Sequence, residues 1–528
     1  MLFTSYGFIA FLVMVLVLYY LVPKKWQWPM LLVASYVFYY IANPMYLLFI
    51  LVTTMSAYIV SIQMDRINRQ TTQYLQEHHA ELGKEEKKAY KNKMKAGKWI
   101  WLLFGLFINI GILSVTKYTN FVIDNINGLF AGEGPIPMVD MIVPMGISFY
   151  TFQTVGYIID VYRGKQEPER NPFKLALFVS FFPQLVQGPI SRFEELATSL
   201  FAEHPFHGKT VSFGLMRILW GYFKKLVLAD RMLPAVLVLV RKPEEYTGAY
   251  VLVAMLLYAY ELYCDFTGGI DITIGIAETM GIHMPENFRQ PYFSKNIREY
   301  WKRWHITMGA WFTDYLFYPL SVCGPMRRLT KWSREHLGEV IGKRVPVYLS
   351  AFFVWLATGI WHGAAWNFVV WGLMNFLVII ISQELEPVYA RFHKALPVKG
   401  NVIYEGFQIV RTILLMSAIR MFDCYRNVPL TFAMLGSMCV AWDGAVLTDG
   451  SLLRLGLSVA DYILLAVGLV LLLAVSLYQV RVGKVREALY HKPPVVYYGV
   501  MAMLFVAIIL FGAYGIGYDP SQFIYNQF

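Results

Sequence analysis

Two histidines stand where an imidazole could move protons. His362 lies in the apolar run FFVWLATGIWHGAAWNFVVWG, and His305 ends an R-W-H string fifty-seven residues earlier. An ionisable side chain at membrane depth is costly and is by default a functional-site hypothesis. A neutral imidazole can accept a proton from a hydroxyl and later give it to a thiolate. Alternatively, each histidine is structural and bonded to a neighbouring segment. Gly359 and Gly363 leave space beside His362, which fits a channel or a close helix contact.

A basic, aromatic stretch precedes this apolar run. From Glu286 it reads ENFRQPYFSKNIREYWKRWHITMGAWFTDYLFYPL. Its cations are Arg289, Lys295, Arg298, Lys302 and Arg303, and a second group follows at Arg327, Arg328, Lys331, Arg334, Lys343 and Arg344. One interpretation is a cytoplasmic loop that obeys the positive-inside rule. The other is a cytoplasmic mouth that attracts an anionic donor, such as the phosphates of coenzyme A or an acidic carrier protein.

Long apolar segments must position these residues. A membrane span needs about 20 apolar residues. The candidates are 3–22, 28–42, 45–63, 99–117, 141–161, 211–239, 248–266, 346–364, 366–382, 402–422, 456–479 and 495–516. Shorter pieces at 173–190, 306–322 and 430–442 are expected to be half-helices or re-entrant segments, which must be buried in protein or line a wet cavity. The expected fold is an all-α polytopic membrane protein.

The distribution of charge predicts the orientation of the spans. Segment 65–98 holds nine basic and five acidic residues, and we expect one or two solvated helices on the cytoplasmic side. Lys24 and Lys25 place the end of the first span inside, whereas 124–140 has no Lys or Arg and is expected outside. Arg481, Lys484, Arg486 and Lys492 are expected inside. Both termini are therefore predicted to be extracytoplasmic.

The composition excludes several classes of protein. Of 528 residues, 57% are hydrophobic and only 15% are charged, which excludes disorder, a coiled-coil rod and a small disulfide scaffold and disfavours a soluble enzyme. The net charge of +11 forms no basic stripe on a soluble fold, so nucleic-acid binding is not expected. The four cysteines show neither metal-ligand nor redox spacing, and we expect no metal and no obligatory disulfide.

Five strings together resemble the membrane-bound O-acyltransferase family. They are PMGISFYTFQTVGYIIDVYRG, FFPQLVQGPISRFEEL, YCDFTGGIDITIGIAETMGIHMPENFRQPY, REYWKRWHITMGAWFTDYLFYPL and GIWHGAAWNFVVWG, within residues 140–375. They are most similar to the alginate and peptidoglycan O-acetyltransferase branch, and the teichoic-acid D-alanyl transferases share the R-W-H and W-H-G elements. The resemblance implies a bacterial cytoplasmic membrane protein with a ring of helices and re-entrant helices around a central tunnel. Relatives often carry Arg at the position of Thr313, so a contact made by that Arg is not expected in this chain.

The resemblance also implies site residues and partners. His362 would be the catalytic histidine, with His305 lower in the same tunnel. Substrate binding is expected from Arg298, Lys302, Arg303, Trp304, Trp361 and Asp314. The donor would be acetyl-coenzyme A or an acyl carrier protein, with no tightly bound cofactor. A membrane-anchored, SGNH esterase-like extracytoplasmic transferase would then acylate a cell-surface glycan. Asp265, Asp271 and Glu286 are expected to bond between helices rather than to act in catalysis.

The chain ends in an F-x-Y-x-x-F motif, which is similar to the ending of a small membrane peptide in the D-alanylation system. By that resemblance Tyr525 would receive the acyl group, while Phe523 and Phe528 anchor the tail. Eight extended steps from Gly517 reach about 27 Å, and half the hydrocarbon core is about 15 Å. A phenol of pKa about 10 forms an ester that keeps much of the transfer potential of a thioester, whose thiol has pKa about 8.5.

The sequence divides into four predicted segments. Residues 1–140 hold N-terminal spans with the charged insertion, 141–382 the catalytic core, 383–516 the C-terminal spans and 517–528 the extracytoplasmic tail. Acetyl transfer to an extracytoplasmic polysaccharide is the favoured activity, and D-alanyl transfer to teichoic acid is the alternative within the enzyme class. Two alternatives come from other classes of protein. A transporter would also have basic mouths and a buried histidine, although no inverted repeat is apparent. A scaffold would only hold a partner transferase.

Overall fold

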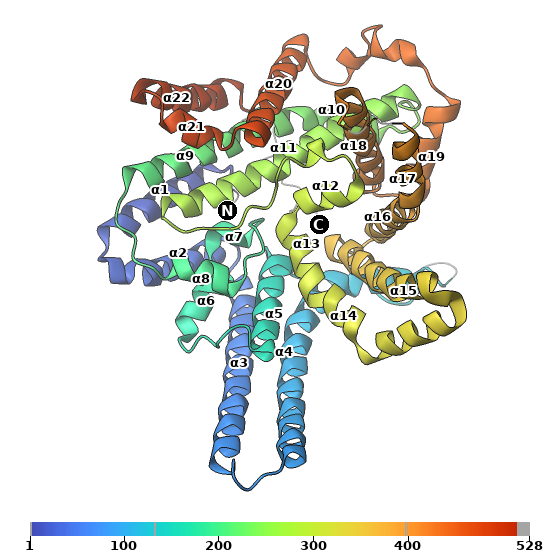
Figure 1. Ribbon diagram of the computed structural model, residues 1–528. Coiled ribbons are helices and arrows are strands. Elements are labelled where there is room, and N and C mark those ends of the chain that lie inside the picture. Colours follow the sequence, from blue (N-terminus) through green and yellow to red (C-terminus); the bar gives the residue numbers. More distant parts are fainter. Residues whose placement is uncertain (1–2, 131–133, 397, 399, 515–528) are drawn as a thin grey trace. The chain divides into compact units, whose positions relative to one another are not determined.

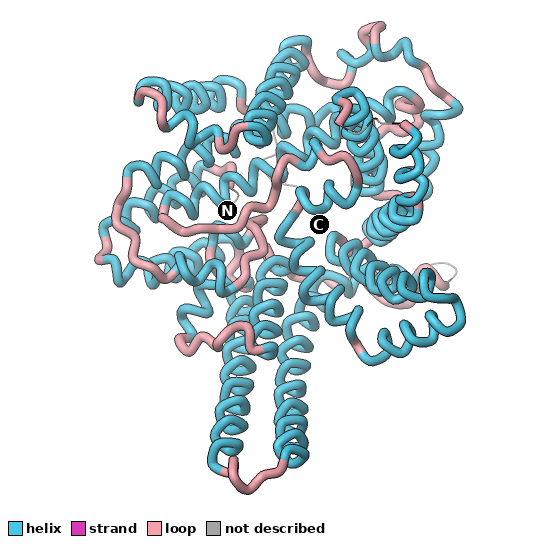
Figure 2. The backbone as a smooth tube through the Cα atoms, in the orientation of Figure 1, coloured by secondary structure: helices cyan, strands magenta, loops and turns pink. Residues whose placement is uncertain are grey.

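The computed structural model describes residues 3–130, 134–396, 398 and 400–514. In these ranges the regular elements are helices, apart from one isolated antiparallel bridge between Phe288 and Trp304 (Figure 2). Eight described helices are long and apolar enough to cross a membrane (Figure 1). They are α3 (Tyr46–Glu77), α4 (Lys84–Asn127), α11 (Ala249–Thr279), α15 (Gly324–His362), α16 (Trp366–Glu384), α18 (Val402–Tyr425), α20 (Val459–Arg481) and α22 (Pro494–Phe511). The prediction of an all-α, multi-pass membrane protein is confirmed.

The backbone forms two compact units. The first comprises Met1–Gly214 and Thr273–Pro285, and the second comprises Leu215–Ile272 and Glu286–Phe528. The first unit also holds α1 (Tyr6–Leu21), α2 (Gln27–Ala42), α5 (Ile147–Arg163), α6 (Pro172–Ser180), α7 (Phe182–Leu185) and α8 (Phe193–Leu200). Short α6 and α7 occupy the segment 173–190, which was predicted to be half-helical.

The charged insertion 65–98 is helical, as predicted. It consists of the polar end of α3 and the polar start of α4, which run side by side (Figure 1). Tyr74 stacks on Tyr90 across the pair, with ring centroids 4.1 Å apart. Glu86 accepts a hydrogen bond from the Gly83 amide and so caps the start of α4. Both helices are thus single rods that continue from an apolar part into a polar part.

Shorter helices connect the spans of the second unit. Residues 306–322, predicted to be re-entrant, form α13 (Ile306–Phe312), the π-helical turn η4 (Thr313–Phe317) and α14 (Tyr318–Val322). The other short helices are α10 (Asp230–Arg241), α12 (Ile297–Arg303), α17 (Glu386–Ala395), α19 (Val428–Val440) and α21 (Val485–Tyr490). The predicted span 211–239 is not one regular helix, because a π-helical turn, η2 (Phe223–Ala229), separates α9 (Gly208–Tyr222) from α10.

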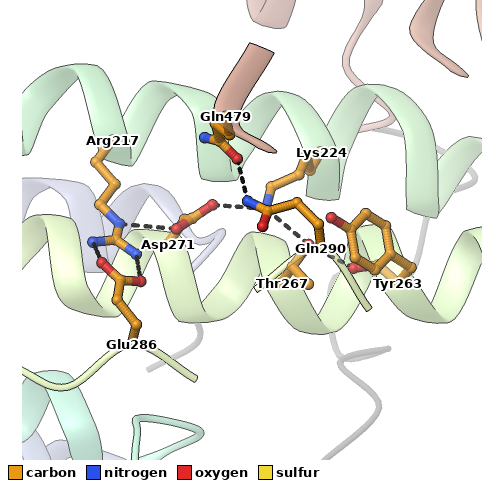
Figure 3. A network of polar contacts seen from close by, with 8 residues as sticks. All are labelled: Arg217, Lys224, Tyr263, Thr267, Asp271, Glu286, Gln290 and Gln479. Carbon is orange, nitrogen blue, oxygen red and sulfur yellow. Dashed lines mark hydrogen bonds and ion pairs between the residues drawn. The ribbon is translucent and has the colours of Figure 1, made fainter. Parts of the chain in front are cut away.

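Buried ion pairs tie this interrupted segment to α11 (Figure 3). The Asp271 carboxylate lies 2.8 Å from Arg217 Nε and 2.7 Å from Lys224 Nζ, and Arg217 also pairs with Glu286. Lys224 donates a further hydrogen bond to Thr267 Oγ1. Buried charges are tolerated when they are paired in this way. The expectation that Asp271 and Glu286 bond between elements is confirmed.

The next lysine of the π-helical turn repeats the arrangement. Lys225 Nζ lies 2.5 Å from an Asp265 oxygen and 2.7 Å from an Asp230 oxygen. The π-helical turn brings adjacent Lys224 and Lys225 into the protein interior together, and both are almost fully buried. Asp265 therefore also bonds between helices, as expected.

Candidate active site

A strained loop places His305 in the interior of the second unit. The Phe288–Trp304 bridge is flanked by two backbone hydrogen bonds, from Arg289 to the Arg303 carbonyl and from Ile306 to the Asn287 carbonyl. His305 itself adopts a left-handed backbone, with φ 49° and ψ 53°, and is 1% exposed. A left-handed non-glycine residue costs about 1–3 kcal/mol and persists only where its surroundings enforce it. The fold thus holds this side chain in a fixed position.

Asn287 fixes the tautomer of His305. Its Oδ1 accepts hydrogen bonds from the Thr307 amide and the Thr307 hydroxyl, at 3.1 and 2.9 Å. A backbone amide can only donate, so this atom must be the oxygen. His305 Nδ1, 3.2 Å from the same oxygen, therefore donates, and Nε2 carries the lone pair in the neutral ring. Nε2 is buried and has no hydrogen-bond partner among the described residues.

The surroundings of His305 also favour the neutral imidazole. Burial, together with the nearby Arg420 guanidinium, lowers the pKa of His305 to about 3. His305 lies in the connection between α12 and α13, outside the eight long spans. The ring is therefore uncharged at neutral pH and presents a proton-accepting nitrogen.

His362 is the last residue of α15, because Gly363 is extended and ends the helix. Glycines let α15 approach α16 closely. A Cβ on Gly359 would lie 2.5 Å from the Phe368 carbonyl oxygen, and one on Gly372 would lie 2.4 Å from that of Trp355. A close helix contact, one of the two interpretations of the small residues beside His362, is therefore observed.

The two histidines belong to one closed circuit of ring contacts. Trp361 links them, with ring centroids 6.0 Å from His305 and 5.1 Å from His362. His362 in turn contacts Trp371 at 4.5 Å. Each ring of this aromatic circuit contacts the next at 4.5–6.1 Å, in the order Tyr300, Trp304, Phe266, His305, Trp361, His362, Trp371, Trp301 and back to Tyr300. The R-W-H and W-H-G strings thus form a single structural centre.

Arg420 on α18 is a residue of this centre that we did not predict. It is 5% exposed, and its guanidinium carbon lies 4.2 Å from the centroid of the Trp304 ring. Its Nη2 donates to the Tyr300 hydroxyl at 3.4 Å. Arg420 lies inside the predicted span 402–422, so the rule that singled out His362, an ionisable residue within an apolar run, would also have found it.

The other predicted substrate-binding residues lie outside the aromatic circuit. Arg298 lies 3.8 Å from Glu386, and Arg303 pairs with Glu299 at 2.6 Å. Lys302 is exposed, and Asp314 is half-buried in η4. Trp304 and Trp361, by contrast, are buried members of the circuit.

The predicted acceptor tyrosine and tail anchors, Tyr525, Phe523 and Phe528, lie outside the described residues. Thr313, at the start of η4, donates a hydrogen bond to the Gly309 carbonyl of the preceding α13. In the described part of the chain, no group of three or more His, Cys, Asp or Glu side chains could hold a metal ion. The described centre thus consists of imidazole, indole, phenol and guanidinium groups.

Known proteins resemble this chain over most of its length. The membrane-bound O-acyltransferase family profile matches residues 169–425, which include both histidines and Arg420. A probable alginate O-acetylase of Pseudomonas putida is 31% identical over 84% of either chain. A peptidoglycan O-acetyltransferase of Helicobacter pylori is 30% identical over 59% of this chain and 60% of its own. A teichoic acid D-alanyltransferase of Bacillus subtilis is 27% identical over 47% of this chain and 61% of its own. The chain belongs to the membrane-bound O-acyltransferase family.

Proposed function

We propose that this O-acyltransferase takes an acetyl group from cytoplasmic acetyl-coenzyme A and passes it across the membrane for O-acetylation of an extracytoplasmic polysaccharide. The observation that carries the chemistry is the contact of both imidazoles with Trp361, which brings the buried His305 and the half-buried His362 into one centre. Similarity to alginate and peptidoglycan O-acetyltransferases supports acetyl as the acyl group and a surface glycan as the final acceptor.

The acceptor of the first step is the phenol of Tyr525 in the F-x-Y-x-x-F tail. His362 takes the phenolic proton while the oxygen attacks the thioester carbon, and the departing thiolate is then protonated. The acetyl-tyrosine ester delivers the group to a membrane-anchored, SGNH esterase-like partner outside. The basic residues of the R-W-H segment attract the anionic donor on the cytoplasmic side, and both termini are extracytoplasmic.

Mass spectrometry tests this relay directly. The purified protein, reconstituted in liposomes, is incubated with acetyl-coenzyme A and digested, and the C-terminal peptide should gain one acetyl group. Tyr525→Phe should abolish the gain, with Tyr514→Phe as the matched control on the same terminal segment. No label on the wild-type C-terminal peptide, a label that persists in Tyr525→Phe, or unchanged glycan acetylation by Tyr525→Phe would contradict the relay.

The donor is tested in the same preparation. Acetyl-coenzyme A and a D-alanyl carrier protein are supplied separately, and only the first should acylate the chain. Acylation by the carrier protein alone would favour D-alanyl transfer. Solute flux without any acyl transfer would instead favour a transporter.

A further inference from the structure

The Arg420 guanidinium carries a buried positive charge that forms no close ion pair with a carboxylate of the described residues. Among the described residues its side-chain hydrogen bond goes from Nη2 to the Tyr300 hydroxyl, and Nε donates none. Asp423, three residues later, attracts the guanidinium only at longer range and accepts a hydrogen bond from the Tyr258 hydroxyl. A buried cation is costly unless it is paired and hydrogen-bonded. Stacking on Trp304 and one long hydrogen bond to Tyr300 offset only part of this cost.

The other buried cations of the second unit are treated differently. Lys224 and Lys225 each have a carboxylate within 2.7 Å. The buried lysines that join helices are therefore each neutralised by a nearby carboxylate. Arg420 has no carboxylate at such close range, and its position over Trp304 places it beside the residue that precedes His305.

Acyl transfer between a thioester and a hydroxyl creates negative charge at one atom. The hydroxyl proton passes to an imidazole as the new carbon–oxygen bond forms, and the carbonyl π electrons move onto the carbonyl oxygen. The tetrahedral oxyanion then re-forms the carbonyl as the carbon–sulfur bond breaks, and the thiolate takes the proton. A guanidinium at low dielectric can stabilise that oxyanion strongly.

We propose that Arg420 is a catalytic residue that binds the oxyanion formed on the thioester carbonyl. This inference rests on the proposed acyl transfer at the histidine centre. The same cation is poorly placed for the phosphates of coenzyme A, because the pantetheine arm separates them from the thioester, which must reach the histidines. Arg420 thus binds the oxyanion that forms during the reaction, whereas the exposed basic residues of the R-W-H segment bind the phosphates of coenzyme A.

The test compares Arg420→Gln and Arg420→Lys with wild type in liposomes. The maximal rate of acetyl transfer should fall about 10²–10³-fold in Arg420→Gln, while the acetyl-coenzyme A concentration for half-maximal rate stays within about twofold. Arg411→Gln is the matched control. Arg411 lies on the same helix, is half-buried, and donates to the Lys295 carbonyl, away from the aromatic circuit. A rate within twofold of wild type in Arg420→Gln would overturn the proposal, as would a loss confined to the half-maximal concentration.

Binding of unreactive analogues keeps the test decisive if Arg420→Gln does not fold. S-carboxymethyl-coenzyme A carries a carboxylate one carbon beyond the position of the thioester carbonyl, within reach of the same cation, and S-acetonyl-coenzyme A carries a neutral ketone at that place. Wild type should bind the carboxylate at least tenfold more tightly, and Arg420→Lys should lose most of that preference. Equal preference in the two proteins would overturn the assignment.

The two proposals fail differently. If wild type accepts no acetyl from acetyl-coenzyme A, the proposed donor is wrong. The same variants with the thioester that wild type does use then test Arg420, because the oxyanion is common to all such transfers.

Discussion

The indole of Trp361 contacts the imidazoles of both His305 and His362, and its ring meets His305 at an interplanar angle of 66° with centroids 6.0 Å apart. One helix, α15, therefore carries both His362 and the side chain that positions it against the R-W-H loop. We infer that the geometry of the two histidines depends on this indole as much as on either backbone.

Removing the indole should uncouple the two histidines. Trp361→Ala should lower the acyl-transfer rate at least about tenfold, because displacing a reacting group by about 1 Å can cost about 100-fold. Trp361→Phe should retain more activity, since a ring still fills the position. Trp332→Ala is the control, because Trp332 stacks on His336 of the same helix but is 52% exposed. Equal rates in all three variants would show that Trp361 has no positioning role.

Asn287 offers a test of the charge state of His305. With a pKa of about 3, His305 stays neutral over the whole physiological range. Asn287→Asp keeps an oxygen for Thr307 and His305 but adds a negative charge, which favours the imidazolium and raises the pKa of His305. If the reaction needs the neutral ring, lowering the pH inactivates the enzyme. In Asn287→Asp this loss of activity should begin at a higher pH than in wild type. The measurement is the acid limb of the pH–rate profile.

Thr307→Val is the control for this experiment. It removes one hydroxyl donor to Asn287 but leaves the Thr307 amide and adds no charge. Its acid limb should coincide with that of wild type. An unchanged acid limb in Asn287→Asp would mean that His305 does not titrate as a base in the reaction.

Much of the site follows from local sequence. His362 could be singled out because a polar imidazole in an apolar run is costly, and the spans could be located because their length is set by the bilayer. The circuit itself could not be predicted. Its contacts join residues from α11, α12, α15 and α16, and apolar periodicity alone does not say which rings of separate helices meet.

Two further features depend on context that a linear sequence lacks. The π-helical turn at Phe223–Ala229 follows no simple apolar period, so Lys224 and Lys225 resemble ordinary positive-inside residues until their carboxylate partners are seen. Arg420, like His362, is an ionisable residue within a predicted span, but the sequence does not show which rings surround it. Its role depends on Trp304 and Tyr300, more than a hundred residues away.

Asp271 should be essential for stability. Asp271→Asn leaves Arg217 and Lys224 with a neutral partner, and breaking a buried ion pair from one side costs about 3–5 kcal/mol. The unfolding temperature in detergent should drop clearly. Glu286→Gln is the matched control. Glu286 pairs with the same Arg217 but has a side chain 44% exposed, so its loss should cost about 1 kcal/mol or less. Similar unfolding temperatures for the two variants would contradict this account of the network.

The close contact of α15 and α16 can be tested by adding a methyl group at Gly372. Gly372→Ala would put a Cβ 2.4 Å from the Trp355 carbonyl oxygen, a backbone atom that cannot rotate away, so the two helices must separate. Trp371 would move with α16, and its 4.5 Å contact with His362 would lengthen. The acyl-transfer rate should therefore fall more than about tenfold, even if the protein remains folded and monodisperse. Gly436→Ala on α19 is the control, because a Cβ there meets no atom within 4 Å and the helix gains propensity. A Gly372→Ala protein with the wild-type rate would show that His362 does not need the close approach of α16.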